Sequence, residues 1–135
     1  MDTNRIKVLM CCLGPETHNR GIIIVSNILK EAGMEVVYLG NTTPENALKA
    51  GVEEDVQIIG VSSLSGAHLR TGALLLNLAK EKGVDKNIAF MIGGVIPPND
   101  INSLLDMGFT NVMPSGVTRE EIIENMTKAA KAVMS

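Results

Sequence analysis

Short apolar runs alternate with amphipathic segments along the whole chain, and this alternation constrains the fold more than any other feature. The apolar runs span residues 6–13, 35–39, 56–61, 88–92 and 111–113. After each run, apolar residues recur at helical spacing, in residues 19–32, 44–54, a leucine-rich stretch ending near 82, 98–107 and a stretch beginning after 118. Regular alternation of strand and helix predicts an α/β fold in which helices cover both faces of a parallel sheet.

The number of strands and their spacing predict one domain. Five strand–helix units fill the 135 residues without a linker, a repeat or a low-complexity segment, so we expect a single domain over residues 1–135. A doubly wound, five-stranded parallel sheet of this size suits the flavodoxin-like (Rossmann-like) strand order 2-1-3-4-5. In such sheets the ligand binds outside the carboxyl ends of the strands, at the switch point between strands 1 and 3.

Several helix ends are marked in the sequence. Thr43 followed by Pro44 is typical of an N-cap and a proline at the first helical position. The run Thr118-Arg119-Glu120-Glu121 has the form of a capping box and predicts the start of the last helix. Glycines at 33, 83 and 108 follow three of the helical stretches and are expected to end them.

The composition excludes several classes of partner. Twelve Lys and Arg stand against 15 Asp and Glu, and the net charge of −3 offers no electrostatic footprint for nucleic acid or an anionic membrane. The aromatic residues are Tyr38, Phe90 and Phe109, too few for the stacking platforms that bind single-stranded nucleic acid. We therefore expect no nucleic acid and no membrane among the partners.

Nothing in the sequence indicates export or a membrane span. The first residues lack a signal-peptide pattern and no apolar stretch is long enough to cross a bilayer, so we expect a cytoplasmic location. Cys11 and Cys12 are neighbours in the first strand and must point to opposite faces. We expect both to be buried as small apolar residues rather than to form a disulfide or a metal site.

Residues that suit a ligand site are concentrated in three loops expected at one edge of the sheet. The loop after the first strand contains Glu16 and His18, the loop after the third begins Ser62-Ser63-Leu64, and the fourth strand is followed by Gly93-Gly94. Imidazole is the commonest protein metal ligand, and a nearby acceptor often fixes which nitrogen faces the metal. Adjacent glycines leave room for a bulky flat group against the backbone. These loops predict a cofactor cleft.

These motifs resemble the cobalamin-binding domain of base-off, His-on B12 enzymes. That family is marked by Asp-x-His-x-x-Gly, then Ser-x-Leu, then Gly-Gly. The corresponding elements here are Glu16-Thr17-His18-Asn19-Arg20-Gly21, Ser62-Ser63-Leu64 and Gly93-Gly94. The resemblance covers essentially the whole chain, and the residues around the second and third motifs look most like the acyl-CoA mutase branch, typified by methylmalonyl-CoA mutase. Glu16 replaces the family's aspartate and is one methylene longer.

The resemblance implies a role for each motif. His18 would be the lower axial ligand of cobalt, Glu16 would accept the other imidazole N–H, and Ser62 would hydrogen-bond the displaced dimethylbenzimidazole base. The nucleotide tail would enter a slot beside Gly21, Leu64 and the glycine pair. The implied cofactor-binding set is Glu16, Thr17, His18, Asn19, Gly21, Ser62, Ser63, Leu64, Gly93, Gly94 and Val95. His18 is the single implied metal ligand, and no catalytic residue is assigned.

The resemblance also implies a function. The chain would be the cobalamin-binding small subunit of an adenosylcobalamin-dependent acyl-CoA mutase, an isomerase that is inactive without a large, acyl-CoA-binding barrel subunit. A corrinoid carrier for methyl transfer, a non-catalytic B12 sensor or storage module, and a flavodoxin-like domain that has lost the cofactor remain alternatives.

Simpler structural roles stand beside these. Ser62 would then satisfy loop backbone groups, and Gly93-Gly94 would form a turn at a strand end. His68 is expected to open the helix after the third strand and to pack at the surface, although the mutase branch also has a histidine there, which implies a place near the corrin rim. The eight methionines are expected to be core filler and interface residues.

Overall fold

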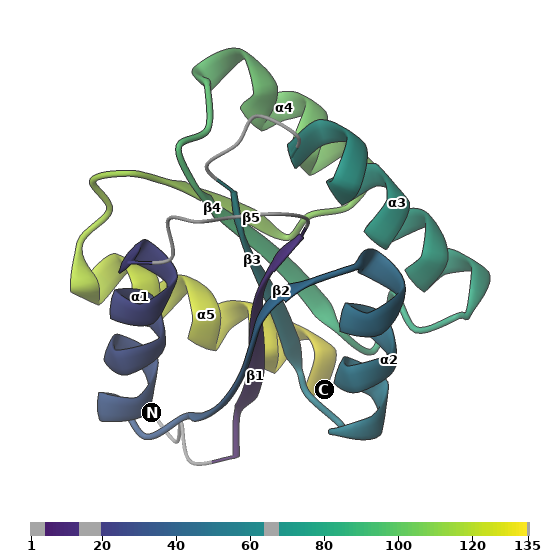
Figure 1. The fold of residues 1–135 in the computed structure, drawn as a ribbon. Coiled ribbons are helices and arrows are strands. Elements are labelled where there is room, and N and C mark those ends of the chain that lie inside the picture. Colours follow the sequence, from purple (N-terminus) through teal and green to yellow (C-terminus); the bar gives the residue numbers. More distant parts are fainter. Residues whose placement is uncertain (1–4, 14–19, 64–67, 135) are drawn as a thin grey trace.

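The computed structural model describes residues 5–13, 20–63 and 68–134. These residues form a five-stranded parallel sheet in the order β2-β1-β3-β4-β5 (Figure 1). The strands are β1 (Lys7–Leu13), β2 (Glu35–Thr42), β3 (Ile58–Ser63), β4 (Ala89–Gly94) and β5 (Asn111–Pro114). The helices are α1 (Arg20–Glu31), α2 (Pro44–Glu53), α3 (His68–Glu81), α4 (Pro98–Met107) and α5 (Arg119–Met134). The predicted fold class and strand order are confirmed.

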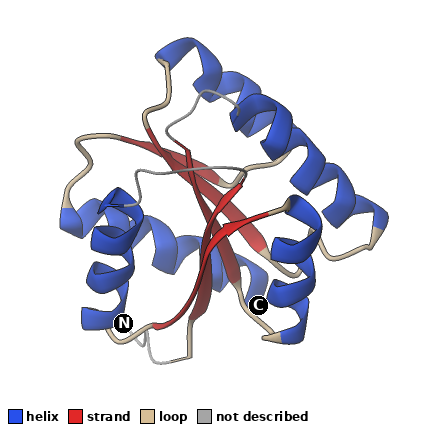
Figure 2. Ribbon diagram, viewed as in Figure 1, coloured by secondary structure: helices blue, strands red, loops and turns tan. Residues whose placement is uncertain are grey.

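The sheet is the middle of three layers (Figure 2). Helices α1 and α5 cover one face, and α2, α3 and α4 cover the other (Figure 1). Successive strand residues point to opposite faces, so one strand serves both cores. On β1, for example, Val8 and Met10 pack on the side of α1 and α5, whereas Leu9 and Cys11 pack on the other side.

The helix starts follow the predicted chemistry. The hydroxyl of Thr43 accepts a hydrogen bond from the backbone N–H of Asn46 at 3.2 Å, with Pro44 at the first helical position. At α5 the Glu121 N–H donates to Thr118 Oγ1 at 3.1 Å, and the Thr118 N–H donates to Glu121 Oε1 at 3.4 Å. Both caps satisfy helix N–H groups that have no partner inside the helix.

Four strands end later than the apolar runs predict: β2, β3, β4 and, by one residue, β5. β3 continues to Ser63 and β4 to Gly94, because the parallel ladder goes on pairing Ser62 with Gly93 and Ser63 with Gly94 after the apolar residues stop. The Ser62-Ser63 and Gly93-Gly94 motifs are therefore strand ends, and their placement in loops was wrong. β2 reaches Thr42 through a register shift, in which Met10 lies opposite Tyr38 but Cys11 lies opposite Gly40.

Over the described ranges, no helix has the length and apolar character needed to cross a membrane.

Candidate functional site

Residues from two separate motifs meet at the carboxyl edge of the sheet. The strand register places Cys12, Ser62, Gly93 and Met113 next to one another in a row across β1, β3, β4 and β5. Ser62 and Gly93, which the sequence assigned to different parts of one cleft, are thus direct neighbours. They lie at the edge where ligands of open α/β sheets bind.

A groove of about 380 Å³ opens beneath this row, between the sheet and helices α1 and α5. Its floor comes from four strands and its walls come from the two helices. The floor residues include Met10, Gly60, Met91 and Met113, the wall residues include Ile22, Val25, Ile28, Ile122 and Met126, and the mouth includes Gly21, Ser62, Gly93, Gly94 and residues 114–117. The volume lies in the range of sites for small molecules.

Gly60 keeps the floor of the groove open. A Cβ at this position would lie 2.6 Å from Met10 Sδ and 3.8 Å from Met126 Cε, so any side chain on Gly60 would enter the space between the sheet and α5. Because Gly60 lies in the middle of β3, its lack of a side chain is a feature of the groove rather than of a turn.

Two different backbone constraints favour glycine at the two positions that end β4. A Cβ on Gly93 would lie 2.9 Å from the carbonyl oxygen of Met113, which belongs to the neighbouring strand. Gly94 has a φ of +119°, which side-chain-bearing residues rarely adopt. Its carbonyl accepts from both the N–H and the hydroxyl of Ser115, at 3.1 and 3.3 Å. The strand-end explanation of this pair therefore holds, while Gly93 and Gly94 also line the groove.

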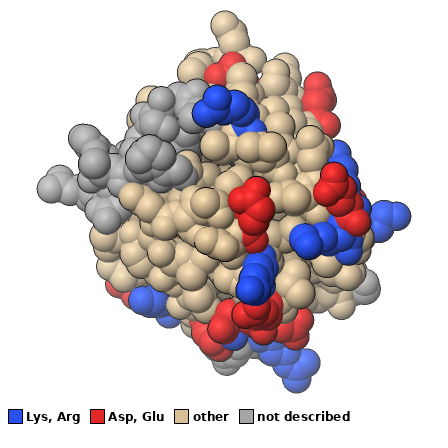
Figure 3. Space-filling model, turned by 45° about the vertical axis from the view of Figure 1, so that its right-hand side comes forward, with Lys and Arg blue, Asp and Glu red and all other residues tan. Residues whose placement is uncertain are grey.

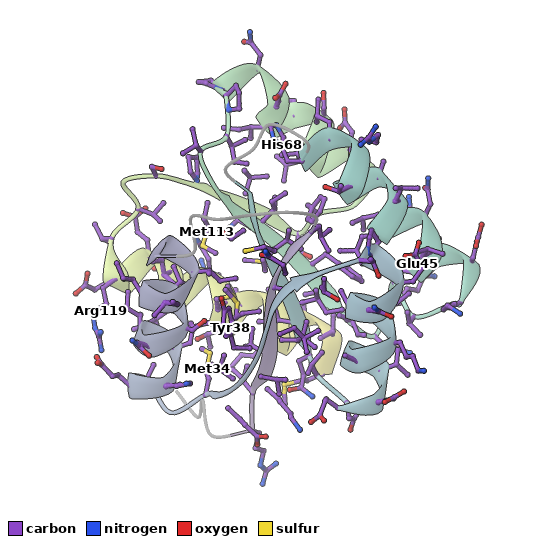
Figure 4. The ribbon with its side chains drawn as sticks, in the orientation of Figure 1. Met34, Tyr38, Glu45, His68, Met113 and Arg119 are labelled. Carbon is purple, nitrogen blue, oxygen red and sulfur yellow. The ribbon has the colours of Figure 1, made fainter. Side chains whose placement is uncertain are left out.

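Few polar side chains line the groove within the part of the chain that the structure describes. Among the lining residues they are Ser62, Ser115 and Arg119. Ser115 is bonded to Gly94, and Arg119 Nη1 lies 2.8 Å from Glu31 Oε2, at the outer side of α1 (Figure 4). The described residues provide no hydrogen-bond partner for the hydroxyl of Ser62. Among the described residues that line the groove, Ser62 is thus the one whose side-chain hydroxyl is available to a ligand.

The cysteines near this edge are buried on opposite faces of β1, as predicted. Burial, together with a smaller contribution from charge repulsion by the neighbouring Cys12, raises the pKa of the Cys11 thiol to about 12. A thiol with such a pKa is protonated at neutral pH, and only the thiolate is a good nucleophile or metal ligand. Cys11 is therefore a core residue.

His68 opens α3 as predicted, but its expected surface packing was wrong. The side chain is 3% exposed and its Nε2 lies 2.8 Å from Asp100 Oδ2 in the first turn of α4. His68 lies between α3 and α4, on the sheet face opposite the groove (Figure 4). Its buried Nδ1 has no hydrogen-bond partner among the residues that the structure describes. A partner 32 residues away left no signal in the sequence.

The structure places some of the predicted site residues and leaves others outside its description. Glu16, Thr17, His18, Asn19 and Leu64 lie outside the described residues. Gly21, Ser62, Gly93 and Gly94 gather at the mouth of the groove. Ser63 ends β3 opposite Gly94, and Val95, just beyond β4, is 61% exposed.

Sequence reasoning missed the lining of the groove. Four of the methionines expected to be core filler are buried core residues and also line the groove, as does Gly60: the methionines are Met10, Met91, Met113 and Met126. The signal that could have found them is period-two alternation, since Met10 and Met91 lie two residues before Cys12 and Gly93 and so point to the same face.

Charged side chains form no single patch of one sign on the face shown in Figure 3, where basic and acidic residues are interspersed. This pattern agrees with the net charge of −3. An electrostatic surface for a polyanion would instead gather Lys and Arg on one face.

The groove and the row of strand ends can now be compared with known proteins. Residues 6–124 match the family model of the B12 binding domain. The chain belongs to this family. It is 32% identical over 133 residues to the 2-hydroxyisobutanoyl-CoA mutase small subunit of Aquincola tertiaricarbonis, covering 98% of this chain and 97% of that one. It is 35% identical to the pivalyl-CoA mutase small subunit of Xanthobacter autotrophicus, covering 93% of this chain and 84% of the relative.

Other relatives carry this B12-binding domain as part of a longer chain. The methylmalonyl-CoA mutase large subunit of Streptomyces virginiae is 33% identical over 129 residues, which are 95% of this chain but 18% of that one. Among solved structures, a cobalamin-binding protein from Desulfitobacterium hafniense superposes with a TM-score of 0.80 at 18% identity, covering 93% of this chain and 59% of the other. At that identity the likeness supports the shared fold.

Proposed function

We propose that this B12-binding domain is the cobalamin-binding small subunit of an adenosylcobalamin-dependent acyl-CoA mutase. The observation that carries the proposal is the end-to-end similarity to two mutase small subunits, at 98% and 93% coverage of this chain. Its partner would be a large, acyl-CoA-binding barrel subunit. The pair would be an isomerase that rearranges a carbon skeleton, with neither subunit active alone.

The described residues fit the nucleotide tail of a corrinoid. The groove is apolar, its floor is open at Gly60, and Ser62 offers a hydroxyl beside the glycine strand end. In this proposal the base lies between the sheet and α1, and Ser62 holds it by a hydrogen bond. Val95 and the backbone around Gly94 lie at the edge of the site, where the corrin would rest.

The remaining roles rest on the resemblance of the motif at 16–21. His18 would be the axial ligand of cobalt and Glu16 would orient its imidazole, with Thr17, Asn19 and Leu64 beside them. When bound, adenosylcobalamin supplies the radical, and the chain contributes binding, orientation and tuning. The longer Glu16 side chain sets how the imidazole is held.

Electron paramagnetic resonance of the protein with Co(II) cobalamin tests this assignment. The chain has two histidines, so labelling histidine with nitrogen-15 leaves His18 and His68 as candidates for an altered axial hyperfine pattern. We expect labelling to change the pattern, His18→Ala to abolish the change and His68→Gln to preserve it. A pattern unaffected by labelling would contradict axial ligation by histidine.

Activity measurements test the subunit role separately. The purified chain should bind cobalamin but isomerise no acyl-CoA until a large mutase subunit is added. Turnover by the isolated chain would contradict the proposal. Copurification from the native source would identify the large subunit and with it the acyl-CoA.

A further inference from the structure

We propose that the hydrogen bond between His68 and Asp100 positions the segment between β4 and α4, residues 95–97, for contact with the corrin of a bound cobalamin. His68 and Asp100 are then positioning residues, which act through this segment rather than by touching the ligand. The inference rests on the proposed function, because it takes the end of β4 as an edge of the cobalamin site. It gives a role to a buried pair on the sheet face opposite the groove.

The segment 95–97 holds an apolar side chain outward on a constrained backbone. Val95 is 61% exposed, the largest exposed fraction among the large apolar side chains that the structure describes. Ile96, the next residue, is buried in the core beneath α2, α3 and α4. Pro97 and Pro98 then fix φ at the entry to α4. A stiff segment keeps its exposed side chain in one place, which suits a ligand contact.

Hydrogen bonds fix this segment at both ends. Before it, the Gly94 carbonyl accepts from the N–H and the hydroxyl of Ser115, at 3.1 and 3.3 Å. After it, the Asp100 N–H donates to the Pro97 carbonyl at 2.9 Å, and the Asp100 carboxylate accepts from His68 Nε2 at 2.8 Å. Asp100 therefore connects the segment to α3 through both its backbone and its side chain.

The imidazole of His68 is a firm anchor because it is buried and depends on Asp100. It is 3% exposed at the start of α3, and a carboxylate only accepts, so Nε2 is the donor. Among the residues that the structure describes, Nδ1 has no partner. Loss of the carboxylate would therefore leave both ring nitrogens unpaired in the core, which is costly. We expect the first turn of α4 to shift in response, and the segment 95–97 with it.

A second hydrogen bond joins the same two helices at their other ends and supplies a control. Lys80 Nζ donates to the backbone carbonyl of Met107, the last residue of α4, at 3.1 Å. This bond ties α3 to α4 far from the segment 95–97, whereas the His68 bond adjoins that segment. Variants that remove each bond therefore separate a general loosening of the helix pair from a loss of position at the site.

Equilibrium dialysis of the full chain against cobalamin tests the inference, at a temperature where circular dichroism shows each variant to be folded. We expect Asp100→Ala to weaken binding about three- to tenfold, in the range for residues that act on a ligand without touching it. Asp100→Asn keeps an oxygen that can accept from His68 and should bind more tightly than Asp100→Ala. Lys80→Met should bind as tightly as the natural chain.

His68→Leu provides an independent route to the same measurement. It removes the hydrogen bond but leaves no unpaired imidazole in the core, so it keeps the inference testable if Asp100→Ala does not fold. We expect it to weaken cobalamin binding to a similar extent as Asp100→Ala.

A double-mutant cycle tests whether Asp100 acts through the segment. Val95→Ala removes most of the exposed side chain and should itself weaken cobalamin binding several-fold. The double variant should then bind little worse than Val95→Ala alone, because there is no longer a valine contact to misplace. Losses that multiply would show that Asp100 affects binding by another route.

The outcomes separate this inference from the proposed function. Unchanged affinity in Asp100→Ala and His68→Leu would overturn the positioning role while leaving cobalamin binding intact. An equal loss in Lys80→Met, or losses that multiply in the double variant, would overturn it as well. A natural chain that does not bind cobalamin would contradict the proposed function, and the inference with it.

Discussion

Gly93 shows at the level of one residue how the sheet and the site constrain the same position. Its missing Cβ would meet the backbone carbonyl of Met113 at 2.9 Å, and backbone gives way less easily than a side chain. We therefore expect Gly93→Ala to lower the free energy of unfolding by about 1–3 kcal/mol, as overpacked sites do. Urea unfolding followed by circular dichroism measures this change.

Gly21 is the matched control for that substitution. A Cβ there meets nothing within 4 Å, and the residue lies in the first turn of α1. Alanine favours helix over glycine by about 1 kcal/mol, so Gly21→Ala should leave stability unchanged or raise it. Equal losses in the two variants would show that the Met113 carbonyl does not set the requirement at Gly93.

The buried thiol of Cys11 predicts a pH dependence of stability. Its pKa is about 12 in the folded chain against an ordinary value of 9.0, because burial disfavours the thiolate. Below pH 9 both states keep the proton. Between pH 9 and 12 the unfolded chain releases it while the folded chain keeps it, so stability falls by up to about 1.4 kcal/mol per pH unit.

Cys11→Ala isolates this contribution from other groups that titrate at high pH. Urea unfolding at pH 8 and pH 10 should show a steeper loss of stability for the natural chain than for the variant, by about 1 kcal/mol. Parallel losses would mean that the thiol titrates alike in both states.

Whole elements were well predicted from periodicity and capping chemistry. The ten elements, their order and the caps at Thr43 and Thr118 follow from local spacing and side-chain hydrogen bonds, both of which are properties of short segments. The ends of β3 and β4 were not predicted, because Ser62 and Gly94 belong to the ladder through pairing with neighbouring strands and not through apolar character. Backbone pairing across a sheet leaves little trace in composition.

The contact between His68 and Asp100 is expected to stabilise the packing of α3 against α4. His68 Nε2 and Asp100 Oδ2 lie 2.8 Å apart, with the imidazole buried. We expect Asp100→Ala to cost about 1.5–3 kcal/mol of stability, since hydrogen bonds to charged groups contribute that much. Asp100→Asn keeps an oxygen that can accept from Nε2 and should cost less.

Chemical denaturation of these variants measures the difference. Asp106 lies on the same helix, is exposed, and serves as the control, so Asp106→Ala should change stability little. A loss in Asp106→Ala as large as that in Asp100→Ala would show that the effect belongs to the helix and not to the His68 contact.

The candidate site is formed by elements from the whole molecule, and this limits how much of the site could be predicted from the sequence. The sequence could predict that Ser62 and Gly93 lie at one edge of the sheet, because parallel strands present their carboxyl ends together. The groove could not be predicted, because its lining joins Met10, Gly60 and Met126 from three elements that are far apart in the sequence. Their meeting depends on register and helix placement, which are set by packing over the full chain.

Binding of cobalamin should stabilise the whole fold. The groove draws its lining from four strands and two helices, so a ligand in it engages only the folded state. At a free concentration of about 100 times its dissociation constant, such a ligand adds about 2.7 kcal/mol to the free energy of unfolding. The midpoint of urea unfolding should rise with cobalamin, and an unchanged midpoint at saturation would contradict binding to the native chain.

The shift of register in β2 bears on how this small protein behaves when concentrated. β2 is an edge strand, and an unpaired edge invites a strand of a neighbouring molecule to add to the sheet. Its ladder is interrupted between Tyr38 and Gly40, and irregular edges of this kind discourage such growth. β2 is also the strand that contributes no residue to the groove. The irregularity that discourages aggregation thus lies in a strand that does not line the ligand groove.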